Sequence, residues 1–250
     1  MQALSPSIRL LHQGTSFSCR ILCFPYAGGG ANIFRSWGQD LVNVELSAIQ
    51  LPGREWRGSE PPFTNLTALV EYLLADVATW LDHDGPNFFF GYSMGAILAY
   101  ELAIRLKRID DTGRLDGLYV AACRAPQLGL IMPNLSTLNP AEFLAAITDL
   151  GGIPDIVLAE PDLLQIALPV LRADFAALDT YRWQDHDRLA CPLTVYGGSD
   201  DPLVSREDLA AWRQRTEKQC RLRLFSGGHF FINSTRGQLL KTLAADLVIP

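Results

Sequence analysis

The feature that most constrains this chain is an apolar run at 88–90 that leads directly into Gly91-Tyr92-Ser93-Met94-Gly95 and then into a helix-forming run. This order predicts a strand, a tight turn and a helix, with Ser93 at the apex of the turn. A serine on so sharp a turn has a strained backbone, so the flanking positions must be almost free of side chains. Gly91 and Gly95 meet that requirement. The segment is therefore typical of a reactive serine presented at the amino end of a helix.

Length, composition and charge narrow the class of protein. The chain has 250 residues, of which 48% are hydrophobic and 19% are charged, and this suits a single α/β domain spanning 1–250. The net charge of −6, with no evident basic face, argues against a nucleic-acid partner. The five cysteines are scattered and no histidine or cysteine cluster has metal-ligand spacing, so we expect free thiols and neither a metal nor a cofactor.

The sequence shows no targeting or membrane signal. Its first residues lack a basic start followed by an apolar stretch, and no apolar run is long enough to span a bilayer. We therefore expect a cytoplasmic protein that does not contact a membrane. No segment reads as an oligomerisation device, which predicts a monomer.

Strand-like and helix-like runs alternate through the first half of the chain, and this alternation predicts a mainly parallel sheet with helices on both faces. A poor edge-strand signal at 8–13 precedes the first clear strand. The expected strands are 20–24, 44–51, 87–90, 117–122, 191–196 and 220–225. The expected helices outside the region 124–179 are 33–41, 66–81 with a cap at Thr64 or Asn65, 96–107, 206–215 and 234–247.

The region 124–179 interrupts the alternation. It contains no convincing strand, and its helical patterns lie at 141–150 and 161–178. Because a structureless loop of roughly 55 residues is improbable in a compact domain, we expect a helical insertion that packs over the sheet edge as a lid. Its apolar side chains fit two roles equally well, as ordinary core or as the lining of an acyl pocket.

Three polar residues follow the carboxyl ends of three expected strands, where open parallel sheets bind ligands: Ser93, an aspartate at 200 or 201, and His229. Their order along the chain is that of α/β-hydrolases. A serine hydroxyl is a poor nucleophile, so an imidazole must take its proton while a carboxylate orients the ring. Of the four histidines, only His229 follows a late strand through a Gly-Gly turn. We prefer Asp201 to Asp200 because it stands where the loop bends back toward a helix.

An oxyanion hole requires two N–H donors aimed at one point. One donor in this architecture is Met94, the residue after the nucleophile. The other should come from the glycine-rich loop at 25–29, and we assign Ala27, with Tyr26 as the alternative. No G-K-[ST] or G-x-G-x-x-G pattern supports a phosphate site in this loop.

Five ordered motifs, F-P-Y-A-G-G-G, L-P-G-R-E, G-Y-S-M-G, G-G-S-D-D-P and S-G-G-H-F-F, resemble those of type II thioesterases, the stand-alone hydrolases of non-ribosomal peptide and polyketide synthases. The resemblance runs from about residue 23 to 231. It implies an α/β-hydrolase fold with a mobile lid, and it carries over Ser93, Asp201 and His229 as catalytic, with Ala27 and Met94 as oxyanion donors. Arg54 belongs to a family hallmark segment, and either pairing with a carboxylate or facing the partner would explain it.

The activity that this resemblance implies is hydrolysis of acyl thioesters on the phosphopantetheine arm of acyl or peptidyl carrier proteins, which clears aberrant acyl groups from the synthase. A carboxylesterase acting on free esters would use the same three residues. An acyltransferase would share the acyl-enzyme. An inactive binding protein on a hydrolase fold is a further alternative, which the complete set of catalytic residues disfavours.

Overall fold

The computed structural model describes residues 2–13, 17–109, 114–129, 134–153, 155–185 and 188–247. In this part of the chain, eight strands form one sheet in the order β1-β2-β4-β3-β5-β6-β7-β8. Strands β3 to β8 run parallel, whereas β1 and β2 pair antiparallel at one edge, so the predicted mainly parallel sheet is confirmed. The strands are β1 Gln2–Ser5, β2 Ile8–His12, β3 Cys19–Phe24, β4 Val44–Ile49, β5 Asn87–Tyr92, β6 Gly117–Ala121, β7 Leu193–Gly198 and β8 Cys220–Phe225.

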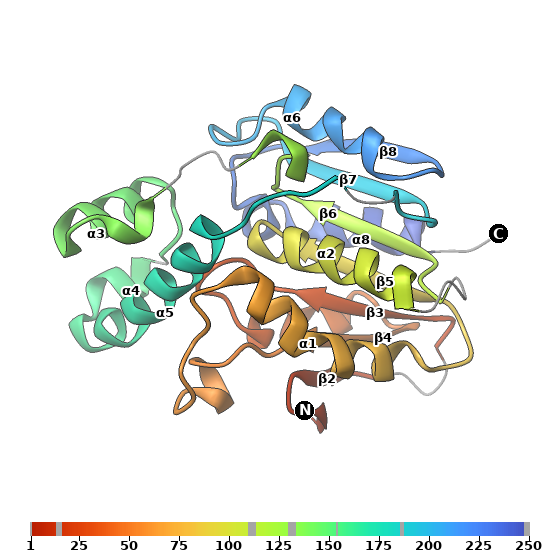
Figure 1. Cartoon of the computed structure of the whole chain (residues 1–250), viewed down its shortest axis with the longest axis horizontal. Helices are drawn as coiled ribbons and strands as arrows, with labels where there is room; N and C mark the ends of the chain where they lie inside the picture. The colour runs from red at the N-terminus through yellow and green to blue at the C-terminus, as the bar shows by residue number, and fades with distance from the viewer. Residues whose placement is uncertain are drawn as a thin grey trace.

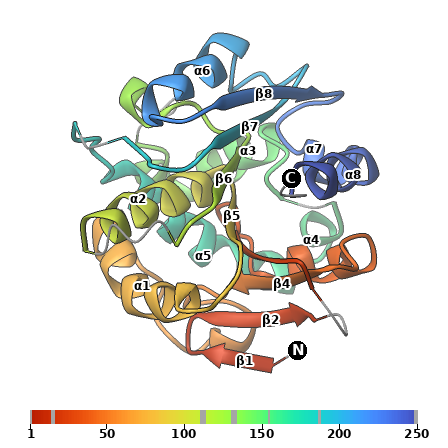
Figure 2. The same cartoon turned by 90° about the vertical axis from the view of Figure 1, so that its right-hand side faces the viewer.

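The sheet has a helical layer on each face (Figures 1 and 2). Helices α1 (Leu66–Leu81), α2 (Met94–Ile109) and α6 (Arg206–Ala210) contribute apolar side chains to the core on one face. The 3-10 helix η1 (Ala31–Gln39), α7 (Phe231–Ser234) and α8 (Arg236–Asp246) build the core on the other face. The central strands are mostly apolar and buried along their whole length because helices cover both faces of the sheet.

Helix α1 illustrates how local sequence sets an element. Its apolar residues recur at the helical period and are buried on one face, and the helix has the bounds 66–81 that were predicted. The Asn65 side chain accepts a hydrogen bond from the Ala68 N–H at 2.9 Å, so Asn65 rather than Thr64 is the cap.

Several elements differ from their predicted form. The helix expected at 33–41 is the 3-10 helix η1, whose asparagine, serine and glycine are weak α-helix formers. The helix expected at 206–215 divides into α6 and the 3-10 helix η5 (Ala211–Arg215). The last helix, expected at 234–247, is α8 at Arg236–Asp246, and the short α7 before it was not predicted. Strand β1 was not predicted, because its four residues are mostly exposed at the sheet edge and lack an apolar face.

A group of helices between β6 and β7 projects beyond one end of the sheet (Figure 1). The described parts of 124–179 contain no strand; residues 130–133 and 154 lie outside the description. The elements are η3 Pro126–Leu128, η4 Leu135–Thr137, α3 Pro140–Asp149, α4 Asp155–Ala159 and α5 Pro161–Asp179. The elements η4, α3, α4 and α5 share a small apolar core that includes Phe143, Ile147 and Leu171. None of the described helices, α5 included, has the length and apolar character needed to cross a bilayer.

Candidate active site

Ser93 stands at the junction of β5 and α2, where the chain reverses direction sharply. Its φ angle of +52° lies in the left-handed region, which is costly for a residue with a side chain. The flanking glycines are required by close packing. A Cβ at Gly91 would collide with the backbone of the first turn of α2, and a Cβ at Gly95 would collide with the Phe24 carbonyl. The strain predicted for the G-x-S-x-G turn is therefore present.

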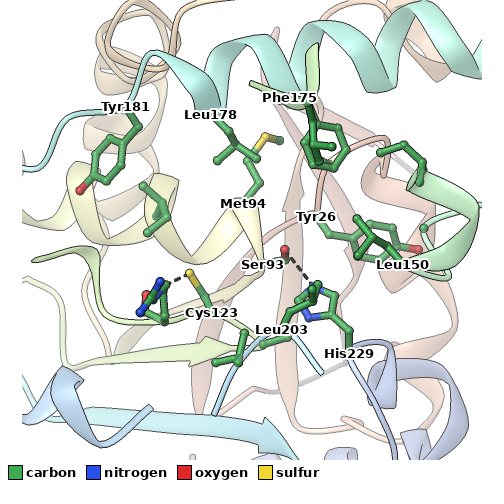
Figure 3. A pocket seen from close by; sticks show the side chains of 18 of the residues that line it. Tyr26, Ser93, Met94, Cys123, Leu150, Phe175, Leu178, Tyr181, Leu203 and His229 are labelled. Carbon is green, nitrogen blue, oxygen red and sulfur yellow. Dashed lines mark hydrogen bonds between the residues drawn. The ribbon is translucent and has the colours of Figure 1, made fainter. Parts of the chain in front are cut away.

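The structure brings Ser93, His229 and Asp201 together from three loops. His229 Nε2 lies 3.2 Å from Ser93 Oγ (Figure 3). On the other side of the ring, His229 Nδ1 lies 2.9 Å from Asp201 Oδ2. His229 and Asp201 are both shielded from solvent, since their side chains are 10% and 1% exposed. With the ring proton on Nδ1, the imidazole donates to the carboxylate and accepts from the serine hydroxyl. This arrangement can remove a proton from Ser93 and return it to a leaving group.

The two neighbouring aspartates have different surroundings. Asp201 uses its second oxygen to accept from the Leu203 N–H at 2.8 Å, which fixes the carboxylate relative to the ring. Asp200 is exposed and accepts from the Ser199 hydroxyl and the Gly227 N–H, so it braces the loop instead of reaching His229. The geometry places Asp201 in the position preferred from the sequence.

Tyr92, the variable residue of the serine turn, links the turn to the histidine loop. Its hydroxyl donates to the His229 carbonyl at 2.5 Å and accepts from the Ile232 N–H at 3.2 Å. Burial raises the pKa of Tyr92, so the phenol stays protonated and keeps its donor role. Sequence reasoning missed this contact, because the motif leaves the residue before the serine unspecified.

A cavity of about 140 Å³ opens over Ser93 and His229. Its lining is largely apolar and comes from both the sheet end and the helices between β6 and β7. In Figure 3, Phe175 and Leu178 point from α5 toward Ser93 and Met94, and Leu150 closes one side. The two roles left open for the inserted apolar residues are divided along these helices: some line the cavity, and others fill the small core among α3, α4 and α5.

Cys123 also lines the cavity, and its chemistry matters because thiolates are strong nucleophiles. Burial raises the pKa of Cys123 to about 12. The thiol therefore remains protonated at neutral pH. Ser93, with its imidazole partner, is the nucleophile that the geometry favours.

Ala27 and Met94, the predicted oxyanion donors, line the same cavity as Ser93. Met94 is the first residue of α2, where N–H groups have no acceptor within the helix. Ala27 lies in a tight turn closed by a 2.9 Å bond from the Gly29 N–H to the Tyr26 carbonyl. The Tyr26 ring packs edge-on against Tyr92 and Phe230, so this side chain forms part of the cavity wall.

Arg54 does not face the solvent or a partner surface. Its guanidinium makes two hydrogen bonds to Asp174 of α5, at 2.6 and 2.7 Å, and both side chains are buried. Of the two roles considered for Arg54, pairing with a carboxylate is the one observed. The partner was missed because it lies 120 residues away, in an insertion with no motif of its own.

Comparison with known proteins adds independent information. The Thioesterase domain family model matches residues 19–247. The gramicidin S biosynthesis protein GrsT of Aneurinibacillus migulanus is 34% identical over 229 residues, covering 91% of this chain and 88% of that protein.

Solved structures with the same architecture include the type II thioesterase BorB from the borrelidin biosynthetic cluster. It has a TM-score of 0.88 and 30% identity, covering 99% of this chain and all of that one. YbtT, a type II thioesterase from the yersiniabactin NRPS/PKS biosynthetic pathway, has a TM-score of 0.83 and 27% identity, covering 96% of this chain and 97% of that one. The fold described above is therefore the predicted α/β-hydrolase fold.

Proposed function

This chain belongs to the thioesterase family and is a thioester hydrolase, and we propose that it serves a non-ribosomal peptide or polyketide synthase. Its substrates are acyl groups held as thioesters on the phosphopantetheine arm of carrier proteins. Its task is to remove acyl groups that are aberrant or stalled. Relatives that carry such pathways in their names support this assignment.

The observation that carries the proposed mechanism is the hydrogen-bonded series from Ser93 through His229 to Asp201, set beneath an apolar cavity. Ser93 Oγ attacks the thioester carbonyl carbon while its proton passes to His229 Nε2. Asp201 stabilises the imidazolium that forms. The oxygen of the tetrahedral intermediate binds the N–H groups of Ala27 and Met94, which stabilise its negative charge.

Collapse of this intermediate breaks the carbon–sulfur bond, and the departing thiol takes the proton from His229. The acyl group is now an ester of Ser93. A water molecule then attacks the ester carbonyl as His229 removes its proton, and the same ring returns that proton to Ser93 Oγ. A thiolate is a better leaving group than an alkoxide, so thioesters suit a site with a general apolar cavity.

The helices between β6 and β7 act in this scheme as a lid over the acyl group. Phe175 and Leu178 of α5 line the cavity that the acyl chain would occupy, which supports the role. The division of the chain into one hydrolase domain at 1–250 with a lid at 124–179 remains our prediction.

The test is product analysis with an acyl group loaded on a carrier protein, compared with a p-nitrophenyl ester of the same acid. We expect free acid and free carrier thiol as products, faster turnover of the thioester, and no hydrolysis by Ser93→Ala. Preference for the free ester would identify a carboxylesterase, and appearance of an acylated alcohol or amine would identify an acyltransferase. Hydrolysis retained by Ser93→Ala would overturn the mechanism.

A further inference from the structure

The loop after β3 carries three consecutive glycines, Gly28, Gly29 and Gly30, next to the proposed oxyanion donor Ala27. Glycine has the widest backbone freedom, and a run of glycines has no side chains with which to fix itself by packing. An oxyanion donor works only when it is already aimed before the reaction. The conformation of this loop must therefore be held by groups from elsewhere in the chain.

Asp174 of α5 supplies the first restraint. Its Oδ2 accepts a hydrogen bond from the Gly28 N–H at 2.7 Å. Gly28 has φ +79°, and the Gly29 N–H bonds to the Tyr26 carbonyl, which together are typical of a type II turn with Gly28 at its third position. Types I and II differ by a flip of the peptide between the two central residues. The carboxylate holds the N–H of that peptide and so selects one of the two orientations.

Arg54 supplies the second restraint. Its Nη1 donates both to Asp174 Oδ2, at 2.6 Å, and to the Gly29 carbonyl, at 3.1 Å, while Nη2 donates to Asp174 Oδ1 at 2.7 Å. The side chains of Arg54 and Asp174 are 7% and 3% exposed. The hydrogen bonds of this ion pair are charge-assisted because they join a guanidinium to a carboxylate. Because the pair is buried, it is stable only when the geometry of these bonds is good. One guanidinium therefore fixes the carboxylate and the loop at the same time.

Two further side chains pack closely against the loop. A Cβ at Gly28 would collide with Leu171, which lies one turn before Asp174 on α5. A Cβ at Gly30 would collide with the Glu55 carboxylate, which accepts from the Asn32 N–H at 3.1 Å. From the segment after β4, Arg54 thus bonds to the glycine loop itself, and Glu55 bonds to the first turn of η1, which follows that loop. The helix and the L-P-G-R-E segment form the two sides of one clamp.

We propose that Arg54 and Asp174 are positioning residues, which set the turn at 26–29 so that the Ala27 N–H is aimed at the developing oxyanion. This inference rests on the proposed function of Ser93 and Ala27. Neither residue touches the substrate. Each acts through the loop, and the insertion thereby contributes to transition-state binding as well as to the acyl cavity.

The test compares Asp174→Asn with Glu45→Gln. Glu45 forms a similar buried ion pair with Arg20 at 2.6 Å, between β3 and β4. That pair lies near the amino ends of the two strands, whereas the candidate active site lies at the carboxyl ends of the sheet. Each variant neutralises one buried carboxylate, so both should lower the melting temperature. Both are assayed at a temperature where circular dichroism shows them folded. We expect Asp174→Asn to lower kcat about tenfold with little change in KM, and Glu45→Gln to leave both near wild type.

A binding measurement separates positioning from general structure. An acyl-pantetheine trifluoromethyl ketone reacts with the serine to form an oxyanion, whereas the matching thioether does not. We expect Asp174→Asn to weaken binding of the ketone by the same factor by which it lowers kcat/KM. Its affinity for the thioether should stay within about twofold of wild type. Equal weakening of both ligands, or wild-type kcat in Asp174→Asn, would overturn the proposal.

Arg54→Lys gives a second reading if Asp174→Asn does not fold. It keeps the positive charge beside Asp174 but loses the fork that reaches Gly29. We expect a smaller fall in kcat, again matched by the ketone and not by the thioether; an unchanged kcat would contradict the role of the fork. Ser93→Ala is run in parallel. If Ser93→Ala still hydrolyses the thioester, the proposed function itself is wrong. If Ser93→Ala is inactive but Asp174→Asn has wild-type kcat, only the positioning role of Asp174 and Arg54 is wrong.

Discussion

Two regions of the molecule meet at the cavity, and they are encoded differently. At the sheet end, Ser93, Asp201 and His229 each follow a parallel strand within four residues, so short local motifs bring them to one edge. The insertion between β6 and β7 contributes Phe175 and Leu178 to the cavity, and both lie in a helical pattern but in no motif tied to chemistry. Their position depends on how α5 packs against the rest of the fold.

The difference shows which parts of a hydrolase tolerate change. The sheet end is tightly packed and strained: Ser93 has a positive φ, and a methyl group added at Gly91 or Gly95 would strike the backbone. The insertion is held by side-chain packing, and the first half of α5 leaves Leu163 and Ile166 exposed. Only the second half, beyond Pro169, is tied to the catalytic loops through Asp174. We therefore expect single substitutions to reduce activity or stability strongly at the sheet end and more modestly in the insertion.

The largest effect is expected for the acid at the sheet end. Asp201→Asn should lower kcat by about 10³- to 10⁴-fold, because the amide favours the wrong ring tautomer of His229. Asp200→Asn, its matched control, should stay within about twofold of wild type, since Asp200 is exposed and bonds to the Ser199 hydroxyl and the Gly227 N–H, but not to the His229 ring. Steady-state hydrolysis of an acyl thioester measures both. Similar losses in the two variants would show that the loop as a whole matters, and not the contact to the ring.

The next largest effect is expected for a methyl group added at Gly95, in the turn that carries Ser93. Gly95→Ala places a Cβ against the Phe24 carbonyl, and we expect a loss of about 3 kcal/mol or more in the free energy of unfolding. Gly237→Ala in α8 meets no atom and has ordinary helical geometry, so it should gain about 0.5 kcal/mol or more. Denaturant unfolding reports both values. An unchanged free energy of unfolding in Gly95→Ala would mean that the serine turn relaxes more easily than its packing indicates.

Substitutions in the insertion should change selectivity more than rate. Phe175→Ala enlarges the cavity beside Ser93, and we expect its kcat/KM ratio for longer over shorter acyl chains to rise about tenfold. Leu163→Ala, on the exposed half of α5, is the control and should leave the ratio unchanged. A series of acyl-pantetheine thioesters of increasing length measures the ratio. The same shift in both variants would place the cause in lid movement and not in the cavity wall.

The smallest effect concerns the thiol in the cavity. Because burial raises the pKa of Cys123 to about 12, the thiolate is scarce below that pH and alkylation requires it. Iodoacetamide at pH 8 should leave both Cys123 and the activity intact, and labelling should begin only in strongly alkaline solution. Mass spectrometry of the modified peptides follows the reaction. Rapid labelling at pH 8 would contradict this assignment.

Much of this fold could be predicted from sequence because its central strands are mainly apolar runs and its turns have strict chemistry. The parallel sheet and α1 follow from such local signals. The exposed edge strand β1 and the 3-10 form of η1 could not be predicted, since their residues have weak preferences that packing overrides.

The candidate site divides in the same way. Ser93, Asp201 and His229 were predictable because topology brings strand ends together, and their catalytic roles stay predictions. The partner of Arg54 was not predictable. Asp174 lies 120 residues further along the chain, and no short-range pattern reports which helix face will meet a distant loop.

The hydroxyl of Tyr92 has a consequence for motion. It bonds at once to the carbonyl of His229 and to the N–H of Ile232, while its own backbone is the last residue of β5 before Ser93. Nucleophile and base are thus tethered to the same residue from opposite sides. We therefore expect a displacement of the strand end to move both residues together and to change the distance between Ser93 and His229 only slightly.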